Sequence, residues 1–268
     1  RVGSSPTSGT RDPARPAPPP LPPASARMHE PDYAYDPARL AAIAQAHADG
    51  FRNADPYPHL VMDGFLRPEV AARLEQVFPG PDDALAWDRF GAQGFEVKLG
   101  SANEEAFPGP LRQAVHDLNA GPFIRFLEAL TGIDHLLPDP HLRGGGLHLS
   151  RQGDHLGIHA DFNWHEGLQA HRRLNLLVYL NPAWQPGWGG ELELWDTGAR
   201  ALCHRIAPLF NRAVLFATRS DTFHGHPTPW AAPDGIHRRS IAMYYYTTDR
   251  PAHEQRPAHN TLYKGYHL

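Results

Sequence analysis

The sequence of residues 144–180, GGGLHLSRQGDHLGIHADFNWHEGLQAHRRLNLLVYL, marks the change from a helical to a β-rich pattern. From here on, short apolar runs alternate with turns that contain Gly, Pro, Asn or Asp. The runs cover residues 146–150, 174–180, 191–195, 213–217 and 240–247. Short strands at this spacing are typical of an antiparallel sandwich or barrel. We therefore predict a double-stranded β-helix, or jelly roll, over residues 144–250.

The chain before this point has a mostly helical pattern over residues 38–132. Apolar side chains recur three and four positions apart, as on one face of a helix. The stretches with this spacing are residues 40–44, 70–77, 111–118 and 123–130. Short strands are expected at residues 59–62 and 95–99. The predicted fold class is α+β: a cupin-like jelly roll with N-terminal supporting helices in residues 28–143, and a C-terminal extension over residues 251–268.

Residues 1–27 differ in composition from the rest of the chain. They contain 8 of the 28 prolines and one large aliphatic side chain, Leu21. Such a segment cannot bury enough apolar surface to fold alone. We expect a disordered Pro-rich tail or a non-native leader ahead of Met28; an organellar transit peptide is a weaker alternative.

Composition excludes several classes of protein. There are 25 Lys+Arg against 29 Asp+Glu, and this balance argues against binding to nucleic acid, which needs cations to neutralise phosphates. The longest apolar runs are far shorter than the ~20 residues of a membrane span, so no membrane partner is expected. Cys203 is the single cysteine, which favours a reducing compartment, and we expect a cytoplasmic location. The chain also has 18 histidines, the commonest neutral metal ligands in proteins.

The residues with the clearest chemical meaning are His159 and Asp161. In a strand, positions i and i+2 point to one face, so an imidazole and a carboxylate would project together. His224 follows 63 residues after Asp161, with Arg238 and Ser240 a further 14 and 16 residues on. Two imidazoles and one carboxylate form the open iron site of non-haem Fe(II) oxygenases. A basic residue and a hydroxyl on one strand face are suited to the distal carboxylate of a dicarboxylate ligand.

These residues resemble a known family, the Fe(II)/2-oxoglutarate-dependent oxygenases, in particular their prolyl-hydroxylase-like branch. The resemblance is carried by five blocks in the family's order: His159-Ala160-Asp161-Phe162-Asn163, Leu176 to Asn181, Gly189 to Leu194, His224 to Pro227, and Arg238 to Ala242.

The resemblance implies a role for each matched residue. The implied iron ligands are His159, Asp161 and His224. Arg238, with Ser240, would bind the C5 carboxylate of 2-oxoglutarate, and Tyr179 falls where the prolyl-hydroxylase-like branch has a tyrosine bonded to that carboxylate. Candidate residues of the substrate pocket are Asn163, Trp164, Arg172 and Asn175.

The resemblance also implies an enzyme, an Fe(II)/2-oxoglutarate-dependent dioxygenase that acts as a hydroxylase. Its cofactors would be Fe(II), 2-oxoglutarate and O₂ as co-substrates, and ascorbate as a reductant. The iron centre would carry the chemistry, and succinate and CO₂ would be released. The substrate, a small molecule or a peptide, stays open among a peptidyl prolyl group, an amino acid, a sugar and a small metabolite.

Two alternatives remain at this stage. His226 lies two residues after His224 and would share its face, so it is the rival for the distal ligand. Arg239 alternates away from Arg238 and is expected to face solvent or a salt partner.

At the level of function, the alternative is a cupin-like metal-dependent isomerase or epimerase, or a non-catalytic metal-binding module. Succinate formation that depends on 2-oxoglutarate would distinguish an oxygenase from these.

Overall fold

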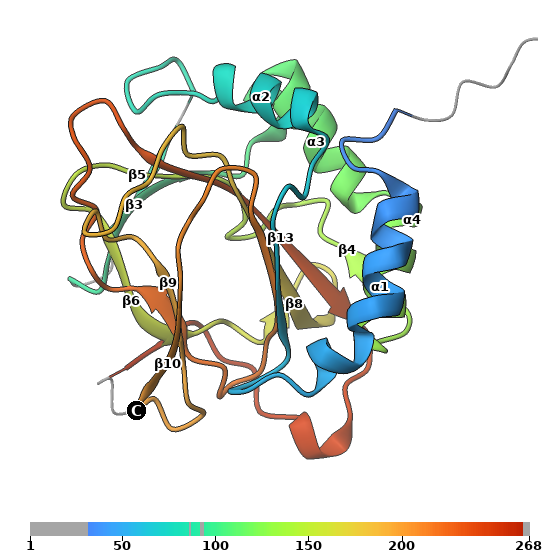
Figure 1. Ribbon diagram of the computed structural model, residues 1–268. Coiled ribbons are helices and arrows are strands. Elements are labelled where there is room, and N and C mark those ends of the chain that lie inside the picture. The colour runs from blue at the N-terminus through green and yellow to red at the C-terminus, as the bar shows by residue number, and fades with distance from the viewer. Residues whose placement is uncertain (1–31, 86, 92–93, 265–268) are drawn as a thin grey trace, which may run out of the picture. The chain divides into compact units, whose positions relative to one another are not determined.

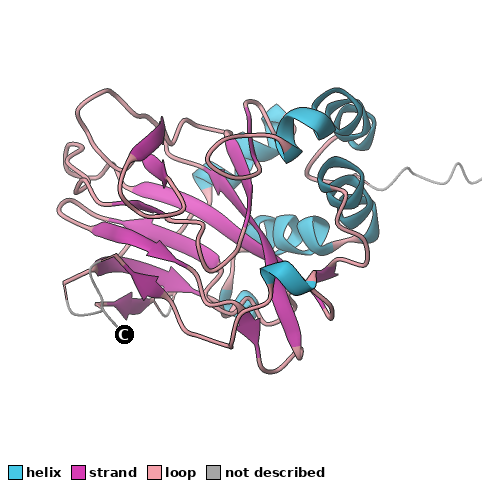
Figure 2. Cartoon of the chain, turned by 90° about the horizontal axis from the view of Figure 1, so that it is seen from below, coloured by secondary structure: helices cyan, strands magenta, loops and turns pink. Residues whose placement is uncertain are grey.

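Two antiparallel sheets form the β-rich half of the chain, as predicted. Their main strands are β1 (His59–Met62), β3 (Glu96–Ser101), β5 (Gly146–Ser150), β6 (His155–Ala160), β8 (Ala170–Tyr179), β9 (Leu192–Trp195), β10 (Leu202–Ile206), β11 (Ala213–Ala217), β12 (His224–His226) and β13 (Arg238–Thr247). Short strands are β2 (Asp88–Phe90), β4 (Leu137–Pro138), β7 (Trp164–His165) and β14 (Leu262–Tyr263). The first sheet has the order β1-β11-β8-β13-β5-β3 and the second has the order β6-β12-β9-β10. Because β3 pairs with both β5 and β6, it joins the two sheets (Figure 1). Most of the helices lie to one side of the strands (Figure 2).

The computed structural model describes residues 32–85, 87–91 and 94–264. The predicted tail, residues 1–27, and residues 265–268 of the predicted extension lie outside these ranges. No helix in the described ranges has the length and apolar character needed to cross a membrane.

Four α-helices and two 3₁₀ turns complete the described part. They are α1 (Pro37–Arg52), α2 (Pro68–Gln76), α3 (Gly109–Asn119), α4 (Gly121–Thr131), η1 (Glu104–Ala106) and η2 (Ala252–Glu254). The helices begin where the sequence favours it: Asp36 accepts hydrogen bonds from the first turn of α1, with Pro37 next to it. Helix α4 ends at Gly132, whose φ of 72° is the left-handed conformation of a helix C-terminus.

The helices cover the outer face of the first sheet, where most of the hydrophobic core lies (Figure 1). Strand β13 shows the alternation that produces this arrangement. Its residues Ile241, Met243 and Tyr245 are fully buried in the core that also contains the apolar faces of the helices. Ser240 and Tyr244 point the other way and line a pocket on the inner face. One sheet therefore presents an apolar face to the helices and a polar face to the pocket.

The strand boundaries differ from the sequence-based ones in an instructive way. Strands β1, β5 and β11 have the predicted bounds. Strand β8 begins at Ala170 and not at residue 174, because residues 171–173 are His-Arg-Arg and give no apolar signal. Strand β12 was not among the predicted runs for the same reason, since its sequence is His-Gly-His. Strand β6 was also not among them, because its apolar residues, Leu156 and Ile158, are separated by a glycine and form no continuous run.

Candidate metal centre

Three potential metal ligands converge where β6 ends and β12 begins. His159 and His224 are direct partners across the two antiparallel strands, and Asp161 follows the end of β6. One ligand atom from each residue lies within 4.8 Å of the others. Asp161 Oδ1 is 3.5 Å from Nε2 of His159, and its Oδ2 is 3.4 Å from Nε2 of His224. The local pairing of β6 with β12 therefore builds the cluster.

The two imidazoles are oriented by backbone carbonyls. His159 Nδ1 lies 2.8 Å from the Gly157 carbonyl oxygen, and His224 Nδ1 lies 3.1 Å from that of Thr222. A nitrogen in such a contact carries the proton and donates it to the carbonyl, which leaves the Nε2 lone pair directed to Asp161. This is the tautomer that a metal-binding histidine needs.

The protonation states also suit a metal. Burial lowers the pKa of His224 to about 4, although the Asp161 carboxylate acts in the opposite direction. Burial tends to raise the pKa of Asp161, but Arg172 and the two histidines outweigh it and hold that pKa well below its usual range. At neutral pH the cluster is therefore an anionic carboxylate with a neutral His224, which is the donor set of a divalent metal site.

Arg172 and Asn175 hold the Asp161 side chain in place. Arg172 Nη2 lies 3.1 Å from Oδ2 of Asp161, and the Asn175 amide donates to the same oxygen at 2.7 Å. The guanidinium also donates from Nε to Asn175 Oδ1 at 2.9 Å and stacks over the Tyr244 ring at 3.4 Å. The pairing of β8 with β13 shifts register next to Arg173, so Arg172 and Asn175 both line the pocket although they are three residues apart.

Arg238 is a buried cation on the same pocket. Its side chain donates from Nε to the Gly190 carbonyl at 2.8 Å and from Nη2 to the Tyr179 hydroxyl at 3.2 Å. Among the described residues no carboxylate forms an ion pair with Arg238, and burial lowers the pKa of its guanidinium. Ser240, two positions on along β13, also lines the pocket. A buried cation without an acidic partner is costly, and an anionic ligand would compensate it.

A pocket of about 160 Å³ contains these groups. It is lined by His159, Asp161 and His224 from the cluster, and by Arg172, Asn175, Arg238 and Ser240. Tyr179 reaches it only through its hydrogen bond with Arg238. The structure therefore brings together eight of the ten residues that the sequence singled out.

Asn163 and Trp164 are the two that do not line the pocket. The Asn163 side chain is used by the C-terminal segment: it donates to the Pro257 carbonyl at 2.9 Å and accepts from the His259 amide at 2.9 Å. The Trp164 ring packs edge-on against His171, 4.8 Å away. Both side chains are therefore used in contacts outside the pocket.

The rival residues are also placed. His226 lines the pocket but is not part of the three-residue cluster. Arg239 faces outward and pairs with Glu75 at 3.4 Å, so the predicted alternation with Arg238 is confirmed.

Sequence reasoning missed pocket residues from the helical half and from the C-terminus, among them Phe90, Glu96, Lys98, Thr261 and Tyr263. It also missed residues of the β-rich half, among them Ser150, Leu156, Phe162, Leu192 and Phe216. The alternation of Glu96 and Lys98 within the predicted strand at residues 95–99 was a usable signal for two of them. Nothing local marks Tyr263, because it reaches the site through a pairing with His159 more than 100 residues earlier in the chain.

Comparisons with known proteins agree with this geometry. Residues 145–246 match the family model of the 2OG-Fe(II) oxygenase superfamily. Among solved structures, a prolyl-4-hydroxylase of Pseudomonas putida is similar at 16% identity and a TM-score of 0.53, covering 76% of this chain and 99% of that one. A prolyl hydroxylase of Trichoplax adhaerens, in complex with a peptide fragment of hypoxia inducible factor, is similar at 17% identity and a TM-score of 0.52, covering 78% and 91%. No curated protein matches the sequence.

Proposed function

We propose that this chain, a 2OG-Fe(II) oxygenase with the fold of the prolyl hydroxylases, hydroxylates a small molecule or a prolyl group of a peptide. The proposal is carried by one observation. A single pocket holds a His-Asp-His cluster and a buried arginine that has no acidic partner among the described residues. The cluster suits Fe(II), and the arginine suits a carboxylate of 2-oxoglutarate.

In this proposal His159, Asp161 and His224 bind the iron. Each contributes one atom, so coordination positions remain for 2-oxoglutarate and O₂. Bound iron supplies, with these two co-substrates, the oxidation that adds one oxygen atom to the substrate and releases succinate and CO₂. Arg172 and Asn175 hold Oδ2 of Asp161, which fixes the orientation of the carboxylate before the metal binds.

Arg238 binds the distal carboxylate of 2-oxoglutarate in this proposal, with Ser240 and the Tyr179 hydroxyl as further donors. The Gly190 carbonyl and Tyr179 fix the guanidinium plane, so little side-chain freedom is lost when the anion binds. Arg172 and Asn175 remain candidates for contact with the substrate, because both line the pocket next to the metal cluster. With Cys203 as the single cysteine, we propose a cytoplasmic location.

The decisive experiment measures succinate formation from 2-oxoglutarate by the Fe(II)-loaded protein, with and without ascorbate. Without its own substrate the enzyme is expected to form succinate slowly. The binding of Fe(II) and 2-oxoglutarate is therefore measured as well, by the charge-transfer absorption of the anaerobic complex. His224→Ala should lose metal binding and succinate formation. The matched control is His226→Ala, which removes another buried pocket imidazole and should retain the metal.

Two outcomes would contradict the proposal. A wild-type chain that binds neither Fe(II) nor 2-oxoglutarate would exclude an oxygenase. Loss of metal in His226→Ala, with retention in His224→Ala, would show that the distal ligand has been assigned to the wrong histidine.

A further inference from the structure

One wall of the pocket carries an ionic pair that the proposed function does not use. Glu96 and Lys98 are two residues apart on β3, so both side chains point to the same face of the strand. Each side chain is only 12% exposed, and both line the pocket. Burial of such a pair costs desolvation free energy, which further contacts with the protein or with a ligand can offset.

The contacts of Glu96 fix the position of Lys98. Lys98 Nζ lies 3.0 Å from Oε1 of Glu96, and the Tyr263 hydroxyl donates to Oε2 at 2.8 Å. Both carboxylate oxygens are therefore engaged. The Lys98 ammonium has three protons, lies 5.3 Å from the centre of the Phe90 ring, and has no second carboxylate partner in the described ranges. It keeps donor capacity for a ligand in the pocket.

The charges that line the pocket favour an anion. Asp161 and Glu96 are its carboxylates, and Lys98, Arg172 and Arg238 are its cations, which leaves a net charge of +1. A divalent iron and the dianion of 2-oxoglutarate together add no net charge, so this excess persists in the loaded enzyme.

The pKa of His148, which also lines the pocket, is lowered by burial and by the same three cations. Burial lowers the pKa of His148 well below its usual range, and Lys98, Arg238 and Arg172 lower it further. The imidazole is therefore neutral and does not add to the cationic charge. The three cations all act on this one pocket residue, which places them around a common volume.

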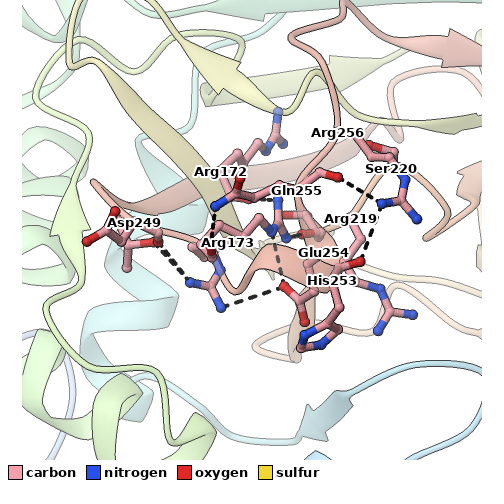
Figure 3. A network of polar contacts seen from close by, with 12 residues as sticks. Arg172, Arg173, Arg219, Ser220, Asp249, His253, Glu254, Gln255 and Arg256 are labelled. Carbon is pink, nitrogen blue, oxygen red and sulfur yellow. Dashed lines mark hydrogen bonds and ion pairs between the residues drawn. The ribbon is translucent and has the colours of Figure 1, made fainter.

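The C-terminal segment closes the pocket beside Lys98. The segment is anchored at η2, where Glu254 approaches Arg173 at 3.9 Å (Figure 3). Glu254 also pairs with Arg250 at 3.1 Å. It continues past Asn163, whose side chain forms two hydrogen bonds with its backbone, and its strand β14 pairs with β6.

This closure limits the size of the substrate. The Tyr263 ring lies 5.5 Å from the ring of His159, and Thr261 from the same segment also lines the pocket. The volume of about 160 Å³ must also hold 2-oxoglutarate, and it is below the ~300–1,000 Å³ of typical ligand pockets. A long peptide would have to displace β14, whereas a small molecule would not.

We propose that the substrate is a small molecule with a free carboxylate and that Lys98 binds this carboxylate. Glu96 and Tyr263 act as positioning residues, because Glu96 pairs with the ammonium and the Tyr263 hydroxyl holds the Glu96 carboxylate. The inference rests on the proposed function, since it names the substrate class of the same site.

The test uses a matched pair of probes, cyclopentanecarboxylate and cyclopentanecarboxamide, which share a ring and differ in charge. Each is titrated into the protein loaded with Mn(II) and saturated with 2-oxoglutarate. Paramagnetic relaxation of the probe protons reports binding close to the metal. We expect the acid to bind at least about tenfold more tightly than the amide, as for a charge-assisted hydrogen bond.

Substitutions at Lys98 and Tyr263 test whether these residues cause the preference for the acid over the amide. Lys98→Met should remove the tenfold preference for the acid while the affinity for 2-oxoglutarate stays unchanged, and Lys98→Arg should keep most of it. Tyr263→Phe should reduce the preference without changing the affinity for the amide, which a general loss of structure would not do. The matched control is Lys264→Met, because Lys264 lies over the Trp195 ring at 3.7 Å and does not line the pocket.

Several results would overturn the inference. They are equal binding of acid and amide, no binding of the acid, and an acid preference that survives in Lys98→Met. A loss of 2-oxoglutarate affinity in Lys98→Met would instead assign this lysine to the co-substrate. None of these touches the proposed function, which is tested separately by succinate formation and by the binding of Fe(II) and 2-oxoglutarate to the wild-type protein.

Discussion

The two faces of the first sheet consist of the same strands but differ in role: the outer face packs in the core, and the inner face lines the pocket. On β8, Leu176 and Val178 point outward and are fully buried in the core beneath the helices. Asn175 and Leu177 on the same strand point inward and line the pocket. The outer face packs mainly apolar side chains against the helices, with the Arg239–Glu75 pair as a polar contact. The inner face has buried polar groups that can still form hydrogen bonds with a ligand.

The difference shows how stability and function are divided within one element. Burial of apolar area stabilises the fold roughly in proportion to that area, whatever the neighbours do chemically. A buried polar group is favourable only when it is paired. Among the described residues, Arg238 has no acidic partner and the Nδ1 atom of His226 has no hydrogen-bond partner. Outer-face substitutions should therefore change stability, and inner-face substitutions should change binding.

The largest effect is expected on the outer face. Leu176→Ala removes a fully buried side chain that lies opposite Met243 on β13. Large-to-small substitutions of this kind cost about 2–5 kcal/mol, because a cavity remains in the core. Urea denaturation followed by circular dichroism would measure the loss in free energy of unfolding.

The control for this prediction is Ser240→Ala on the inner face of β13. It removes one hydroxyl from the pocket, and we expect a change of less than about 1.5 kcal/mol, the range of a single hydrogen bond. Equal destabilisation by the two substitutions would mean that the pocket face also supports the fold.

The second effect is on the binding of 2-oxoglutarate. Arg238→Ala removes the buried cation, and hydrogen bonds to charged groups contribute about 1.5–3 kcal/mol. We therefore expect the affinity for 2-oxoglutarate to fall by at least about tenfold while metal affinity is unchanged. Titration of 2-oxoglutarate into the anaerobic Fe(II) protein, followed by charge-transfer absorption, measures this.

Arg239→Ala is the matched control, since Arg239 is the next residue and faces outward to Glu75. It should leave 2-oxoglutarate affinity at the wild-type level. If Arg239→Ala loses the co-substrate and Arg238→Ala does not, the inner face of β13 has been assigned to the wrong residues.

A smaller effect is expected for Tyr179→Phe. The hydroxyl is a neutral group that contacts Arg238 at 3.2 Å, while the ring stays in place in the substituted protein. The substitution removes one hydroxyl and leaves the Arg238 charge in place, so we expect a loss of about 0.5–1.5 kcal/mol, and the affinity for 2-oxoglutarate should fall by roughly two- to tenfold. The same titration measures it, and a loss as large as that of Arg238→Ala would show that Tyr179 binds the co-substrate as strongly as the arginine does.

How far the sequence predicted this molecule depends on the same contrast between the faces. Apolar alternation made β5 and β11 visible with their observed bounds, because their outer residues are in the core. Strand β12 has no apolar residue and was visible only through the motif that begins with His224. The periodicity of apolar residues predicted the N-terminal helices. Their apolar faces cover the outer face of the first sheet.

Several residues that sequence reasoning did not find reach the site by long-range pairing. Glu96 and Lys98 enter the pocket because β3 pairs with β6, and Tyr263 enters because β14 pairs with the same strand. Asn163 follows the metal motif directly, yet its amide serves the C-terminal segment. Distance along the chain is a poor guide here, since tertiary pairing decides which side chains share a cavity.

The smallest effect is expected for the loss of the outward-facing Arg239 side chain, measured as a change in the free energy of unfolding. Its guanidinium lies 3.4 Å from Oε1 of Glu75 on α2, with side chains 14% and 29% exposed. Ion pairs near the surface contribute about 0–1 kcal/mol, because solvation of the separated charges offsets most of their attraction. Arg239→Ala should therefore lower the free energy of unfolding by no more than about 1 kcal/mol. A double-mutant cycle with Glu75→Ala isolates the pair from the packing of the Arg239 stem over the Phe78 ring, 5.7 Å away. A coupling energy well above 1 kcal/mol would break the contrast between the faces, because a polar contact on the outer face would then stabilise the fold as much as apolar burial does.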